Sequence, residues 1–130
     1  MKKIIFVCVG NSGRSQMAEA IFNKMTEGEA LAASAGTMPA GLVEPDVIEL
    51  MKEEGIDISS AKPKQLTTEM LKEADKVITM GCGVEEACPA FRVNSEDWGL
   101  PDPKGKSKEE IRKIRDEIKV RVIRLLQETL

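Results

Sequence analysis

The sequence predicts an α/β protein with a doubly wound, four-stranded parallel sheet flanked by helices. Short apolar runs rich in Ile and Val alternate with segments whose apolar residues follow helical spacing. The apolar runs are continuous, which is typical of strands buried on both faces of a parallel sheet. The two strongest runs, residues 3–9 and 76–80, are each followed at once by glycine, as expected where a buried strand ends in a loop.

The first half of the chain predicts two strands and two helices. Residues 3–9 form the first strand, and residues 15–25 form a helix with an apolar face. Residues 30–35 form a second short strand. Pro45 suits the first turn of the next helix, because proline lacks only an amide that would have no partner there, and Gly55 ends that helix.

The second half predicts two more strands and two more helices. Thr67 or Thr68 caps a short helix that ends at residue 74, and strands follow at residues 76–80 and 90–93. Ser107 and Glu110 have the spacing of a capping box, which opens the last helix. Its apolar stripe comprises Ile111, Ile114, Ile118, Val122 and Leu125.

Composition limits the classes of function. With 130 residues we expect one domain, residues 1–130. The net charge of −3 and the scarcity of aromatic residues (three Phe, one Trp and no Tyr) argue against nucleic-acid binding. The apolar start is too short for a signal peptide and leads into Gly-Asn-Ser-Gly-Arg, and no run approaches the length of a membrane span. We expect a cytoplasmic protein without a membrane partner.

The loop after the first strand reads CVGNSGRS, residues 8–15. Glycine and asparagine tolerate positive φ, so this backbone can turn successive amides inward and form an anion-binding nest at a helix N-terminus. Arginine can hold a tetrahedral oxyanion with two donors at once. The predicted oxyanion-binding residues are Val9, Gly10, Asn11, Ser12, Gly13 and Arg14.

Cys8 ends the strand at this nest. The positive surroundings favour its thiolate form, which could attack the bound anion, and Ser15 could donate a hydrogen bond to the sulfur. The alternative is a buried cysteine beside a simple strand–helix turn. The segment lacks the Gly-Lys-Ser/Thr of a Walker A loop, and the chain has no histidine, which excludes Cys–His and Ser–His catalysis.

Two further features carry candidate chemistry. Asp102 lies between Pro101 and Pro103, which stiffen its loop, so it is either a positioned general acid or the start of a turn. Cys82 and Cys88 are either structural cysteines, half of a metal site or redox thiols. An odd number of cysteines argues against a disulfide framework, and the absence of histidine disfavours a metal site, so we predict none.

The Cys-x5-Arg-Ser loop resembles that of the low-molecular-weight protein tyrosine phosphatase superfamily. The longer stretch VCVGNSGRSQMAEA is similar to its thioredoxin-coupled arsenate reductase branch. The resemblance covers nearly the whole chain. It includes Ser34-Ala-Gly36, residues 55–59, Trp98-Gly99 and residues 115–118.

The resemblance implies an arsenate reductase that acts as a monomer on arsenate or phosphate oxyanions. Cys8 would form an adduct with arsenate, and Asp102 would be the general acid. Cys82 would resolve the adduct, and Cys88 would present the resulting disulfide to thioredoxin or a similar redox protein. No cofactor would be tightly bound; an external dithiol would supply the electrons.

The alternative function is a phosphatase that hydrolyses phosphomonoesters through a phosphocysteine, and a third is a non-catalytic oxyanion sensor. In the tyrosine phosphatases, aromatic residues after the Asp-Pro pair help to hold an aryl phosphate. Here Lys104-Gly105-Lys106 follows, and the chain has no Tyr, which favours a small inorganic oxyanion.

The resemblance also concerns an ion. Asn11, Glu19 and Ser34 match positions that hold potassium in some relatives, where the fourth ligand is an aspartate. Here that region reads Ala61-Lys-Pro-Lys64, and the ammonium of Lys64 could replace the cation. We therefore expect no bound potassium.

Overall fold

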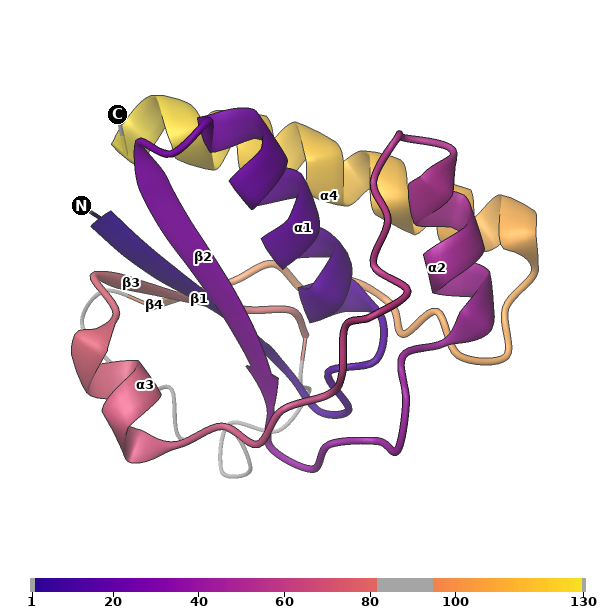
Figure 1. Cartoon of the computed structure of the whole chain (residues 1–130), viewed down its shortest axis with the longest axis horizontal. Helices are drawn as coiled ribbons and strands as arrows, with labels where there is room; N and C mark the ends of the chain where they lie inside the picture. Colours follow the sequence, from indigo (N-terminus) through magenta and orange to yellow (C-terminus); the bar gives the residue numbers. More distant parts are fainter. Residues whose placement is uncertain (1, 82–94, 130) are drawn as a thin grey trace.

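The computed structural model describes residues 2–81 and 95–129. Within these residues, four parallel strands form one sheet (Figure 1). They are β1 (Lys2–Cys8), β2 (Ala30–Gly36), β3 (Lys76–Thr79) and β4 (Ser95–Asp97), and their order across the sheet is β2-β1-β3-β4. The carboxyl ends of β1 and β3 therefore lie side by side, which is where a doubly wound sheet binds its ligands.

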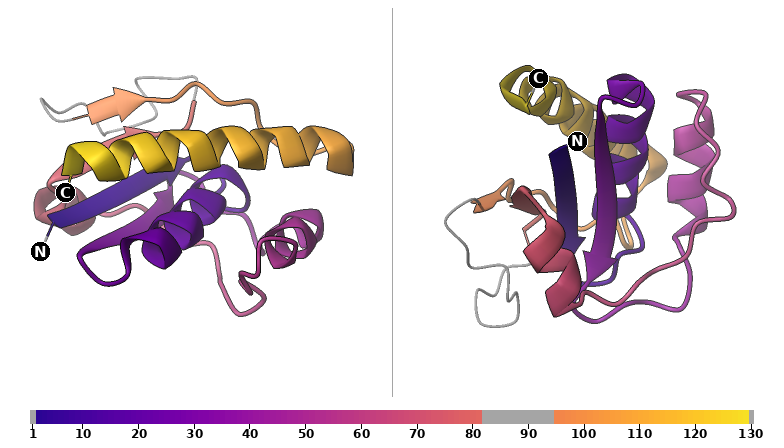
Figure 2. Two further views of the ribbon diagram at one scale, coloured as in Figure 1. Left: turned by 90° about the horizontal axis from the view of Figure 1, so that it is seen from above. Right: turned by 60° about the vertical axis from the view of Figure 1, so that its left-hand side comes forward.

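Helices cover both faces of this sheet, as the sequence predicts. Helices α1 (Arg14–Thr26), α2 (Pro45–Lys52) and α4 (Lys108–Thr129) lie on one side, and α3 (Thr68–Glu73) lies on the other (Figure 2). Among the described residues, no helix is both long enough and apolar enough to span a bilayer.

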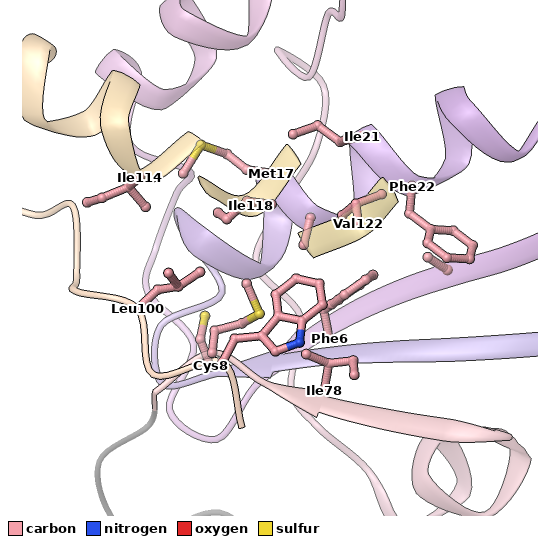
Figure 3. Packing of buried hydrophobic residues seen from close by; sticks show 14 of the residues in the cluster. Phe6, Cys8, Met17, Ile21, Phe22, Ile78, Leu100, Ile114, Ile118 and Val122 are labelled. Atoms are coloured by element: carbon pink, nitrogen blue, oxygen red, sulfur yellow. The ribbon is translucent and has the colours of Figure 1, made fainter. Parts of the chain in front are cut away.

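The main core lies between the sheet and helices α1 and α4. Alternate residues of β1, namely Ile4, Phe6 and Cys8, face this core, because successive side chains of a strand point to opposite faces. The Phe6 ring meets the Phe22 ring edge-on, with centroids 6.1 Å apart. Figure 3 shows Cys8 beside Leu100 on one side of the cluster and Phe22 on the other side. Cys8 is thus the last core residue of β1, at the point where the chain leaves the sheet.

The predicted helix starts are confirmed by their caps. The Thr67 hydroxyl accepts a hydrogen bond from the Met70 amide at 3.2 Å, and α3 begins at Thr68. The Ser107 hydroxyl accepts from the Glu110 amide at 3.2 Å, and the Glu110 carboxylate accepts from the Ser107 amide at 3.3 Å. This reciprocal pair is the capping box, and α4 follows it.

The fourth strand that the structure describes was not expected from the sequence. The sequence predicts a strand at residues 90–93, which lie outside the described residues, so this prediction is not tested. The described strand β4 is Ser95–Asp97. This segment reads Ser-Glu-Asp and is partly or fully exposed at the sheet edge, so no apolar pattern marks it as a strand.

Ion pairs hold α2 against α4. The Glu53 carboxylate, just after α2, accepts from Arg112 Nη2 at 2.8 Å and from Arg115 Nη1 at 2.8 Å. Arg115 is nearly buried, and its Nη1 also donates to the Leu50 carbonyl at 2.9 Å. The hydrogen bonds from Arg112 and then from Arg115 lower the pKa of Glu53 from 4.5 to about 2.

The lowered pKa of Glu53 predicts a stability difference that depends on pH. Because the folded state holds the carboxylate ionised, the contribution of Glu53 is complete above pH 4.5 and is lost as the pH falls toward 2. We expect Glu53→Gln to unfold at lower urea than the wild type at neutral pH, and the gap to narrow across this range.

The matched control is Glu117→Gln, which removes a single exposed i,i+4 pair with Arg121. Such pairs contribute little, so this variant should follow the wild type at every pH. A gap between Glu53→Gln and the wild type that stays constant down to pH 2 would contradict the assignment.

Candidate active site

The loop between β1 and α1, residues 8–13, turns its carbonyl groups outward; we call it the cradle. The carbonyls of Cys8, Val9, Gly10 and Ser12 accept from four amides of residues 37–44, at 2.9–3.1 Å. The Asn11 carbonyl accepts from Gln16 Nε2 at 3.2 Å, and the Gly13 carbonyl accepts from the Met17 amide at 2.9 Å. Every carbonyl of the cradle therefore has a donor outside it.

Three amides of the cradle are open to a ligand. In the described parts of the chain, the amides of Gly10, Ser12 and Gly13 have no protein acceptor. Asn11 has a φ of 50°, which bends the backbone, and its own amide donates to the Cys8 sulfur at 3.2 Å. The positive end of α1 adds to this field, so the cradle suits a tetrahedral anion in front of Cys8.

Gly36, at the end of β2, allows the cradle to lie this close to the sheet. A Cβ at this position would stand 2.5 Å from the Val9 carbonyl oxygen and 3.1 Å from the Asn11 amide nitrogen. Only glycine fits without moving the loop. Sequence reasoning noted Gly36 only as part of the resemblance, although a glycine ending the strand beside β1 was available as a signal.

Arg14 closes the other side of the cradle. The residue is nearly buried at the start of α1. Its Nη1 donates to the carbonyls of Met80 at 2.7 Å, Leu100 at 2.8 Å and Gly81 at 3.2 Å. These bonds use one of the three guanidinium nitrogens. They tie the end of β3 to the loop after β4, and Nε and Nη2 can then serve an oxyanion.

The Cys8 sulfur is buried and receives a directed set of hydrogen bonds. It lies 2.8 Å from the Ser15 hydroxyl oxygen. That oxygen accepts from Asn11 Nδ2 at 2.7 Å, so the Ser15 hydrogen is free to point at the sulfur. Together with the Asn11 amide, the sulfur then has two hydrogen-bond donors.

One backbone group determines the direction of this chain of bonds. The Lys64 amide can only donate, and it lies 2.8 Å from Asn11 Oδ1, which fixes which end of the Asn11 amide is the oxygen. Nδ2 must then donate to Ser15 and to Ser34, the latter at 3.0 Å. The Ser34 hydroxyl in turn donates to the Glu19 carboxylate at 2.7 Å.

A lysine lies beside the three residues that match a potassium site in some relatives. Asn11, Glu19 and Ser34 lie together, linked by the bonds just described. The Lys64 ammonium stands 3.6 Å from Glu19 Oε1. A positive charge therefore already faces this carboxylate.

The loop that carries Asp102 packs on the cradle. A Cβ on Gly13 would stand 2.6 Å from Pro103 Cγ, so the two loops touch where Gly13 has no side chain. Pro103 is buried and Asp102 is exposed, and Asp102 Oδ1 accepts from the Lys104 amide at 3.0 Å. The Leu100 bond to Arg14 holds the other end of the loop. Asp102 is thus carried beside the cradle on a braced segment.

The structure brings most of the predicted site residues together. The side chains of Cys8, Arg14 and Ser15 and the backbone of Val9, Gly10, Asn11, Ser12 and Gly13 form one site at the carboxyl ends of β1 and β3. Asp102 lies on the adjoining loop. Cys82 and Cys88 lie outside the described residues; Gly81, which precedes Cys82, is the last described residue before them.

Two further residues of the site escaped sequence reasoning. The Asp97 carboxylate accepts from the Gly81 amide at 2.8 Å and from the Thr79 hydroxyl at 2.9 Å, so it holds the end of β3. Gln16 is 2% exposed and contacts Asn11. No pattern marks Asp97 as a site residue. Gln16 stands in the stretch VCVGNSGRSQMAEA that carries the family resemblance, but the stretch does not reveal that Gln16 is buried against Asn11.

Comparisons with known proteins place this chain in a family. The model of the low molecular weight phosphotyrosine protein phosphatases matches residues 3–130. The arsenate reductase of Staphylococcus xylosus is 41% identical over 123 residues, which are 93% of this chain and 93% of that protein.

Two solved structures share the fold over nearly the whole chain. One is described as an arsenate reductase in the phosphate binding state; it has a TM-score of 0.89, 38% identity and coverage of 98% of each chain. The other is the YwlE arginine phosphatase of Geobacillus stearothermophilus, with a TM-score of 0.87, 27% identity and coverage of 99% of this chain and 93% of that one. The chain belongs to the low molecular weight phosphotyrosine protein phosphatase family.

Proposed function

We propose that the chain is an arsenate reductase that binds arsenate in the cradle and reduces it through a relay of three thiols. The observation that carries the proposal is the directed set of donors around Cys8, in a chain 41% identical to an arsenate reductase over nearly its full length. Arg14 and the cradle amides hold the oxyanion, and their partners already fix their orientation.

The first step joins sulfur to arsenic. The Cys8 thiolate attacks the arsenic atom, an S–As bond forms, and one arsenic–oxygen bond breaks. Asp102 supplies the proton to the departing oxygen, which leaves as water or hydroxide. Arsenic is still As(V) at this point.

The second step reduces arsenic. The Cys82 thiolate attacks the Cys8 sulfur, and the electron pair of the S–As bond stays on arsenic, which leaves as arsenite, As(III). The Cys88 thiolate then attacks the Cys82 sulfur and releases Cys8. An external dithiol such as thioredoxin reduces the Cys82–Cys88 disulfide, so the two electrons come from that partner. Gly81, the residue before Cys82 in the sequence, has a carbonyl that accepts from Arg14, which supports the assignment of Cys82 to the relay.

No alkali cation takes part in this proposal. The Lys64 ammonium at 3.6 Å already balances the Glu19 carboxylate, so the residues around Asn11 and Ser34 do not fit a bound potassium ion.

The second candidate is a phosphatase, favoured by the likeness to a structure described as an arginine phosphatase. Phosphate would be transferred to Cys8 and released by water. The cradle serves both reactions, so the two functions are distinguished by features beyond it: the additional thiols, and the lack of aromatic residues after Asp102-Pro103.

Replacing Cys82 distinguishes the two functions. We expect Cys82→Ser to lose arsenate reduction while it still hydrolyses p-nitrophenyl phosphate, because hydrolysis needs only the cradle, Cys8 and Asp102. Steady-state turnover of both substrates in the presence of a dithiol donor measures this.

Cys88→Ser is the matched control. It should release a single burst of arsenite and then stop, because the Cys8–Cys82 disulfide has no thiol to accept it. Sustained arsenate reduction by Cys82→Ser would overturn the relay.

Asp102→Asn tests the general acid. We expect hydrolysis of an alkyl phosphate, whose leaving oxygen is strongly basic, to fall by about 100-fold or more. Hydrolysis of p-nitrophenyl phosphate, whose leaving group needs less help, should fall less. Inhibition by inorganic phosphate serves as the binding control and should change little. Equal losses on the two esters would show that Asp102 is not the proton donor.

A further inference from the structure

Gln16 is a buried polar residue to which the proposed reaction assigns no role. It lies in the first turn of α1 and is 2% exposed. Its Nε2 donates to Asn11 Oδ1 at 3.0 Å, to the Asn11 carbonyl at 3.2 Å and to the Lys62 carbonyl at 3.2 Å. A single amide group therefore contacts both oxygens of Asn11 and the segment that crosses behind the cradle.

The hydrogen bond from Gln16 to the Asn11 carbonyl differs from the hydrogen bonds that the other cradle carbonyls accept. The other five carbonyls are held by backbone amides, which the fold supplies whatever the side chains are. The Asn11 carbonyl alone depends on a side chain. Because the Asn11 carbonyl and the Ser12 amide belong to one peptide plane, a donor that holds the carbonyl outward also holds that amide inward.

The bond to Asn11 Oδ1 acts on the nucleophile. Oδ1 accepts from Gln16 and from the Lys64 amide, which occupies both of its lone pairs. Nδ2 is then held toward Ser15 and Ser34. Ser15 in turn directs its hydrogen to the Cys8 sulfur.

We propose that Gln16 is a positioning residue that acts through Asn11 at two points: it keeps the Ser12 amide aimed at the oxyanion, and it keeps the Ser15 hydroxyl aimed at the Cys8 thiolate. The Gln16 side chain itself donates to Asn11 and Lys62, and to neither the oxyanion site nor the Cys8 sulfur. The inference rests on the proposed function only in taking Cys8 as the nucleophile, which the reductase and the phosphatase share.

The test is the rate at which iodoacetamide alkylates Cys8, followed by mass spectrometry of the peptide that contains it, as a function of pH. Gln16→Met keeps the length of the side chain and removes the donor. We expect the midpoint of the pH profile to rise by about half a pH unit or more, because the thiolate loses part of its support. We also expect inorganic phosphate to protect Cys8 about fivefold less well, as for the loss of one hydrogen bond.

Gln65→Met is the matched control. Gln65 Nε2 also donates to three carbonyls, those of Gly36, Thr37 and Leu66, but none belongs to the cradle. Its profile should match that of the wild type. The charged groups around the cradle are unchanged in both variants: Arg14 of α1, Glu19 with Lys64, and Asp102 of the Pro-Asp-Pro loop.

A second variant, Gln16→Glu, tests the proposal in case Gln16→Met does not fold. Gln16→Glu keeps the volume and turns the donor into an acceptor that faces two oxygens of Asn11. It should raise the midpoint further and weaken phosphate protection further. Thermal unfolding identifies any variant that is not folded.

The inference is overturned if either folded Gln16 variant alkylates like the wild type, or if Gln65→Met shifts the profile as much as Gln16→Met. Because alkylation uses neither arsenate nor a reductant, these outcomes are independent of the Cys82 experiment.

Discussion

The outward orientation of six consecutive carbonyls in residues 8–13 is the constraint on which the site depends. An anion site made of backbone needs its amides on one side, so each carbonyl must find a donor on the other side. Residues 37–44 supply four of these donors through their backbone amides. Helix α1 supplies the other two, the backbone amide of Met17 and the side chain of Gln16. Gly36 allows this close packing, because a Cβ there would meet the Val9 carbonyl oxygen at 2.5 Å.

The second ordering element is Arg14, which braces the site in addition to its proposed part in binding the anion. Three carbonyls on two segments converge on its Nη1. The burial of the guanidinium is tolerated because each contact is a hydrogen bond to a charged donor. The loop of Asp102 is therefore coupled to the cradle both through Arg14 and through the contact of Pro103 with Gly13.

Much of this could be predicted from the sequence, for identifiable reasons. The strands and helices with apolar stripes are confirmed because hydrophobic periodicity and capping are local signals. β4 was not predicted because Ser95–Asp97 is polar and gains its pairing from β3. The cradle could be predicted because its residues are adjacent in sequence.

The residues that hold the cradle in place from other parts of the chain could not be predicted in this way. Lys64, Met80 and Leu100 act through backbone atoms, so their side chains carry no signal for the role. Gln16 looks like any polar residue of a first helical turn, and only the fold reveals that it is buried against Asn11. The side chains of the cradle and of its neighbours thus indicated the proposed reaction from the sequence. The geometry of the site depends on long-range contacts to backbone atoms, which the sequence does not indicate.

In the proposed site, the amides of Gly10, Ser12 and Gly13 and the side chain of Arg14 converge on one oxyanion in front of Cys8. A titration of the ¹⁵N-labelled protein with inorganic phosphate, followed by amide NMR, tests this arrangement most directly. We expect the largest downfield proton shifts at the amides of Gly10, Ser12 and Gly13, which have no acceptor among the described residues. Shifts confined to other segments, with these three amides unchanged, would contradict it.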